Sequence, residues 1–177
     1  SPEGLNISQR NITVSTCGLI PRIEDFMKHM KQVNLAVSLH SADQDLRESM
    51  MPISRQYPVD RLLQACREYT EETGRRITFE YALVKGKTDT QEQMNLLVQK
   101  LKGMLCHVNL IPLNQVKEAG LSGSSRKEAA RLAEFLESRG IPATVRRELG
   151  ADIEAAYGQL RLGESEAMNP EGMKQKQ

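Results

Sequence analysis

The sequence predicts an α/β protein in which a parallel sheet is joined by helical crossovers. The first observation is that five short β-rich runs alternate with segments whose apolar residues recur at helical spacing. The second is that the runs in the middle of the chain are apolar at nearly every position, which is typical of buried parallel strands. Alternation of this kind favours right-handed β-α-β crossovers.

The expected elements follow from these patterns and from helix-end signals. A Thr90-x-x-Gln93 and a Ser125-x-x-Glu128 pattern each predict a helix start, and Gly74 predicts a helix end. A further helical turn is expected over 43–50, and the proline-marked stretch 51–58 is expected to be a loop. The expected strands are 11–17, 34–40, 77–84, 107–113 and 142–149, and the main helices are 21–32, 59–74, 90–103 and 125–140.

Composition restricts the class of protein. A chain of 177 residues with 39% hydrophobic and 27% charged residues suits one soluble globular domain. The net charge of +1 argues against a protein that coats nucleic acid, although a local basic patch remains possible. No apolar run approaches the length of a membrane span, so we expect no membrane partner. The chain starts with Ser rather than Met, so we expect a fragment or a processed product.

The cysteines indicate neither a disulfide framework nor a metal site. Cys17, Cys66 and Cys106 are odd in number and widely spaced, without a CxxC pair, which favours a reducing cytoplasm. Cys106 and His107 are adjacent, but neighbouring strand residues point to opposite faces. We therefore predict that no metal is bound by the residues of this chain.

Polar residues gather where the expected strands end. Ser15, Ser38, His40 and Asn114 lie at or near the ends of three strands, with Leu39 between two of them. Because parallel α/β proteins bind ligands at the carboxyl ends of their strands, these groups predict a rim that holds a polar small molecule. The alternative is that the Ser and Asn residues form turns or caps, and that His40 is a structural histidine.

Three charged residues on expected strands have two interpretations each. Glu80 lies inside an apolar strand, where it either points into a barrel lumen or pairs with Arg75 or Arg76. Arg146 and Arg147 either contact phosphate or form a solvated face.

Five segments in order resemble one family, the radical S-adenosylmethionine (SAM) RNA methyltransferases of the RlmN/Cfr type. The segments are NITVSTCGLIPRI, NLAVSLHSADQDLRESMMPISRQYP, ITFEYALVKGKTDT, VNLIPLN and ATVRRELGADIEAAYGQLR. The resemblance runs from about residue 2 to 163. It implies that residues 1–163 form the C-terminal part of a partial (β/α)6 barrel that lacks its first strands, with a substrate loop at 150–160. The polar composition of 164–177 separately predicts a disordered tail.

The resemblance also implies an activity, its cofactors and its partners. It implies methylation of ring carbon 2 of an adenine in large-subunit ribosomal RNA and in transfer RNA. We also expect the protein to be cytoplasmic and monomeric. SAM contacts carry over to Ser15, Ser38, Leu39, His40 and Asn114. The family's [4Fe–4S] cluster is held by a CxxxCxxC motif, which this sequence does not contain.

The sequence departs from the family at one position of the loop. Where the family has a cysteine that carries the transferred methyl group, this chain has Tyr157, within Ala155-Ala156-Tyr157-Gly158-Gln159. A phenol with a pKa near 10 is a poor nucleophile, so we expect this chain to be inactive by that route. The alternatives are a non-catalytic SAM- or RNA-binding relative, and an unrelated α/β-barrel enzyme.

Overall fold

The computed structural model describes residues 12–29, 32–113 and 125–146. In this part of the chain, strands and helices alternate as the sequence predicts. The elements are β1 (Thr13–Thr16), α2 (Ile20–His29), β2 (Asn34–Ser38), α3 (Gln44–Met50), α4 (Ile53–Gln56), α5 (Val59–Thr73), β3 (Ile77–Leu83), α6 (Gln91–Leu101), β4 (Cys106–Pro112), α7 (Arg126–Ser138) and β5 (Ala143–Val145).

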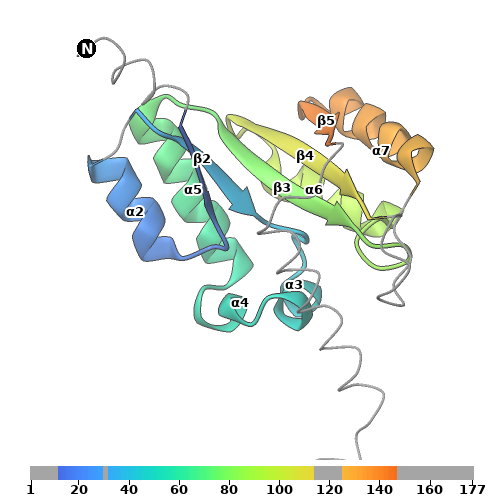
Figure 1. Ribbon diagram of the computed structural model, residues 1–177, viewed down its shortest axis with the longest axis horizontal. Helices are drawn as coiled ribbons and strands as arrows, with labels where there is room; N and C mark the ends of the chain where they lie inside the picture. Colours follow the sequence, from blue (N-terminus) through green and yellow to red (C-terminus); the bar gives the residue numbers. More distant parts are fainter. Residues whose placement is uncertain (1–11, 30–31, 114–124, 147–177) are drawn as a thin grey trace, which may run out of the picture.

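The strands form one parallel sheet in the order β1-β2-β3-β4-β5 (Figure 1). An open doubly wound sheet would reverse its strand order at a switch point, whereas here each strand is added beside the last. Crossovers of one hand then place their helices on one face of the sheet. This is the arrangement of a barrel segment, and the predicted fold class is confirmed.

One hydrophobic core lies between the sheet and helices α2, α5, α6 and α7. Alternate residues of β3 enter this core, among them Phe79 and Tyr81, both fully buried. The residues that alternate with them, Thr78 and Glu80, must face the other side of the sheet because strand side chains alternate. We name that side the inner face.

The helix ends that were predicted from sequence are present. The Thr90 side chain accepts a hydrogen bond from the Gln93 amide at 3.2 Å, and Ser125 accepts one from the Glu128 amide at 3.2 Å. Gly74 ends α5 in the left-handed conformation, at φ 66°. These signals succeed because each involves residues only a few positions apart.

The segment 51–58 corrects the sequence analysis, since it contains helix α4 instead of a plain loop. Pro52 has αR dihedrals, at φ −57° and ψ −26°, which suit the start of a helix. The Gln44 side chain then holds the segment, because it donates to the Ser54 carbonyl at 3.0 Å and accepts from the Val59 amide at 2.7 Å. The strand predicted over 142–149 corresponds to β5, which covers only Ala143–Val145. Residues 147–149 lie outside the described ranges.

Helices α3 and α4 lie at the carboxyl end of the sheet (Figure 1). A second, smaller apolar cluster joins them to the ends of β3 and β4, with Met50 and Met51 packed near Val84 and Leu113. This packing holds α3 and α4 in place against the carboxyl end of the sheet. No helix in the described ranges is both long and apolar enough to cross a membrane.

Candidate functional site

The predicted rim residues of β1 and β2 share the inner face. Ser15 pairs in register with Ala36, and Ser38 lies two residues further along the same strand. Ser15 is exposed at the edge of the sheet, and Ser38 is buried. Their hydroxyl groups can therefore both be offered to a ligand that lies over β1 and β2. Asn114 lies outside the described residues.

Strand β2 ends in a tight bend at His40, which has a left-handed backbone at φ 60°. The amides of Leu39 and His40 both donate to the Glu80 carbonyl, at 2.9 and 3.3 Å. The His40 ring accepts a hydrogen bond from the Ala82 amide at Nδ1, at 2.9 Å. A nitrogen that accepts cannot carry the proton, so the neutral ring carries it on Nε2. This bond gives His40 a structural role and fixes which ring nitrogen can donate.

Leu39 lies directly after β2, and its side chain is turned away from the inner face. Its side chain is fully buried in the hydrophobic core under the helices. Its carbonyl accepts a hydrogen bond from Arg47 Nε at 3.0 Å. Because its amide also donates to the Glu80 carbonyl, both main-chain groups of Leu39 have partners within the protein.

Arg47 was missed by the sequence analysis, in which it is part of a short helical turn. The residue is fully buried in α3, and its guanidinium donates to carbonyls at the ends of β1 and β2. Burial lowers the pKa of Arg47 to about 10, while Cys17 and Cys66 nearby act in the opposite direction. An arginine in a helix has no sequence signal for such a contact.

A row of polar side chains crosses the inner face at one register level. Ser38, Glu80, Asn109 and Thr144 are successive neighbours on β2, β3, β4 and β5. The Thr144 hydroxyl donates to Asn109 Oδ1 and lies 3.0 Å from His107 Nε2. Hydroxyl, amide, carboxylate and imidazole groups thus all lie on the inner face, the side of the sheet away from the helices.

Glu80 faces the inner side and pairs with a partner that the sequence analysis did not name. Its Oε1 lies 2.9 Å from Arg146 Nη1, beside the end of β5. The expected partners were Arg75 and Arg76. The first of these donates instead to Asn34 Oδ1, at 3.3 Å. Strand register explains the correction, since it places Arg146 just beyond Thr144, on the same face as Glu80. Arg147 lies outside the described residues.

The cysteines do not form a cluster. Cys66 and Cys106 are buried in the core, and burial raises the pKa of both thiols, that of Cys106 to about 11. His107 lies on the opposite face from Cys106, and its own pKa is lowered, chiefly by burial and then by Arg76. Among the described residues, no group of three or more His, Cys, Asp or Glu could hold a metal ion.

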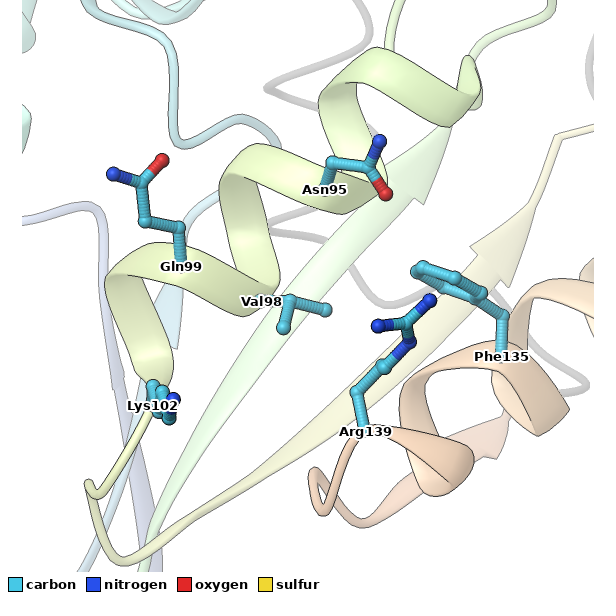
Figure 2. A pocket seen from close by; sticks show the side chains of 6 residues that line it. All are labelled: Asn95, Val98, Gln99, Lys102, Phe135 and Arg139. Carbon is cyan, nitrogen blue, oxygen red and sulfur yellow. The ribbon is translucent and has the colours of Figure 1, made fainter.

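A pocket on the outer side of the molecule is remote from this rim. It lies between α6 and α7, and the Arg139 guanidinium stacks 5.2 Å from the centre of the Phe135 ring (Figure 2). Both helices end beside it, so it lies near the amino ends of the strands that follow them. Its lining residues are Asn95, Val98, Gln99, Lys102, Phe135 and Arg139.

Comparisons with solved structures show which class of protein this chain resembles. A radical SAM methyltransferase from Sphaerobacter thermophilus matches with a TM-score of 0.76 and 50% identity, over 85% of this chain and 44% of that chain. A domain of pyruvate-formate lyase-activating enzyme from Bacteroides vulgatus has a TM-score of 0.61 at 17% identity, over 82% of this chain and 91% of that domain, which supports the fold alone. No family model matches the chain.

Comparison with curated protein sequences points to a more specific group within this class. A protein named probable dual-specificity RNA methyltransferase RlmN, from Caldanaerobacter subterraneus subsp. tengcongensis, is 53% identical over 161 residues. The match covers 91% of this chain and 47% of the relative, so the chain spans about half the length of that protein. By sequence and fold, the chain matches the C-terminal part of proteins named RlmN and of a radical SAM methyltransferase.

Proposed function

We propose that this chain is the C-terminal part of a radical SAM enzyme that methylates ring carbon 2 of an adenine in large-subunit ribosomal RNA and in transfer RNA. The observation that carries the proposal is the 53% identity over 91% of the chain to a relative named as a dual-specificity RNA methyltransferase. A cytoplasmic, monomeric enzyme is part of the same proposal, and sedimentation of the purified chain tests the monomer.

In this proposal the rim at the ends of β1 and β2 binds SAM. Two hydroxyl groups, those of Ser15 and Ser38, share the inner face there, and the bend after Ser38 places Leu39 and His40 directly beside them. Asn114 is assigned to the same site from the family resemblance. SAM supplies the methyl group, and the residues of this chain hold and orient the molecule through hydrogen bonds.

The described residues do not fit the [4Fe–4S] cluster that the resemblance implies. Such clusters are held by cysteine thiolates. Cys66 and Cys106 are packed as buried thiols with raised pKa, which disfavours the thiolate form. The family's cluster motif, CxxxCxxC, does not occur in this sequence.

Tyr157 supports a second candidate function, a SAM- or RNA-binding protein without methyl transfer. The residue lies outside the described ranges, at the position where the family has its methyl-carrying cysteine. A phenol is protonated at neutral pH and is a weak nucleophile. We therefore propose that the chain as it stands does not transfer a methyl group through residue 157.

The test uses a protein in which the N-terminal half of the Caldanaerobacter relative precedes residues 1–177. Transfer of labelled methyl from SAM to ribosomal RNA is measured with Tyr157 and with Tyr157→Cys, and the labelled nucleoside is identified by mass spectrometry. We expect transfer with the cysteine and none with the tyrosine. Binding of SAM without transfer by the cluster-loaded Tyr157→Cys protein would support the binding function, and equal transfer by both proteins would refute the role of residue 157.

A further inference from the structure

The end of β1 and the end of β2 are joined by one buried side chain. Main-chain pairing between the two strands is in register up to Thr16 and Val37. Beyond that point, Arg47 Nη2 donates to the Cys17 carbonyl at 3.0 Å and to the Ser38 carbonyl at 3.1 Å. Its Nε donates to the Leu39 carbonyl at 3.0 Å. The guanidinium therefore continues the connection where the two strands no longer pair.

This arginine has no acidic partner in the described part of the chain, although it is fully buried. Removing a charge from water is costly, and a buried arginine is normally paired with a carboxylate. Here the carbonyl oxygens of three residues take that place through charge-assisted hydrogen bonds. The guanidinium suits this task because its nitrogens are held in one plane. Nη2 contacts the Cys17 and Ser38 carbonyls while Nε contacts the Leu39 carbonyl, in a fixed geometry.

The backbone at Gly18 is shaped to admit the guanidinium. Gly18 has φ +104°, and a Cβ atom at this position would lie 2.9 Å from Arg47 Nη2 and 3.1 Å from Leu62 Cδ2. A side chain at residue 18 would therefore displace Arg47 or Leu62 and would also strain the backbone. The end of β1 thus leaves space for the guanidinium, an arrangement that general core packing does not require.

The residues held by Arg47 are those assigned to SAM. Ser38 and Leu39 are bonded directly through their carbonyls, and His40 is the next residue. Ser15 lies two residues before Cys17, on the strand that the guanidinium joins to β2. We propose that Arg47 is a positioning residue, which holds the ends of β1 and β2 in register and so orients the groups that bind SAM.

This inference rests on the proposed function for its ligand, and its test has two independent readouts. The first is the dissociation constant of SAM, measured by titration calorimetry on the cluster-loaded protein in which the N-terminal half of the Caldanaerobacter relative precedes residues 1–177. The second is amide hydrogen exchange of peptides that cover residues 15–19 and 38–42, which needs no ligand. The variants are Arg47→Met, which removes every donor, and Arg47→Lys, which keeps the charge but has one nitrogen instead of a fork. The control is Leu136→Ala, a buried core substitution in α7 on the opposite edge of the sheet.

We expect Arg47→Met to weaken SAM binding by about tenfold or more, and Arg47→Lys to weaken it by a similar or smaller factor. Exchange at Leu39 and His40 should accelerate in both variants. Leu136→Ala should lower thermal stability while leaving SAM affinity and rim exchange within about twofold of the unmodified chain. If Arg47→Met does not fold, Arg47→Lys is compared with the control instead.

The outcomes separate the two claims. Arg47 variants that match the control in both SAM affinity and rim exchange would overturn the positioning role. If the cluster-loaded protein with unmodified Arg47 binds no SAM, the proposed function fails. Rim exchange then still decides whether Arg47 holds the strand ends, and unchanged exchange would overturn that claim as well.

Discussion

The ion pair between Glu80 and Arg146 gives the sharpest quantitative prediction about this fold. It links β3 in the middle of the sheet to the residue just after β5, a three-residue edge strand. The separation of Oε1 and Nη1 is 2.9 Å, and the exposed fractions of the two side chains are 8% for Glu80 and 34% for Arg146. The pair therefore lies between the fully exposed and the fully buried case.

The magnitude follows from that position. Exposed ion pairs contribute roughly 0.2–1 kcal/mol, whereas removal of one partner from a buried pair costs roughly 3–5 kcal/mol. We expect Glu80→Gln to lower the free energy of unfolding by about 2 kcal/mol, because Glu80 is buried and Arg146 keeps partial access to water. Across Glu80→Gln, Arg146→Met and the double variant, the coupling energy should be about 1–2 kcal/mol.

The chain offers a matched control on its surface. Arg131 and Glu128 form a pair at 2.6 Å within α7, shorter than the pair on the sheet, but with exposed fractions of 55% and 37%. The same cycle on this pair should give less than about 0.5 kcal/mol, as is usual for helix pairs three residues apart. Urea denaturation at pH 7 measures both cycles. If the two coupling energies are equal, burial does not set the strength of the Glu80–Arg146 pair, and the reasoning is refuted.

Three further predictions concern glycine, thiols and alkaline pH. Gly18→Ala should cost about 2–3 kcal/mol and Gly74→Ala about 1 kcal/mol in urea denaturation, because both have positive φ but only Gly18 has neighbours in the way of a Cβ; equal losses would contradict the crowding. In the native protein, Ellman's reagent should modify exposed Cys17 and leave buried Cys66 and Cys106 unmodified until urea is added; rapid native modification of Cys66 would contradict its burial. Burial raises the pKa of Cys106 from 9.0 to about 11, so the unfolded chain loses this proton first. Cys106 should therefore lower the free energy of unfolding by about 1–2 kcal/mol between pH 8 and 10.5, in addition to the fall caused by the raised pKa of Cys66. The Cys106 contribution, measured as the difference from Cys106→Ala, should be absent in that variant.

Local patterns in the sequence were sufficient to predict most of the elements and a parallel α/β fold, whereas the partial barrel was implied by the family resemblance. The capping residues Thr90 and Ser125 contact amides three positions away, and Gly74 ends its helix through its own backbone conformation. Apolar periodicity likewise compares near neighbours, and it located the five strands. Ser15 and Ser38 were placed at strand ends for the same reason, and the sheet brings them to one face.

The tertiary structure decided which distant residues meet. Glu80 and Arg146 are 66 positions apart, and their contact depends on the strand order and on the register of β3, β4 and β5. Arg47 contacts Cys17 across 30 positions, from a short helix whose sequence shows no sign of a buried cation. Helix α4 depends in the same way on the Gln44 side chain, which reaches back to it from α3. Periodicity and capping report contacts within one or two turns of chain, whereas these contacts exist only once the sheet has set its register and the helices have packed against it.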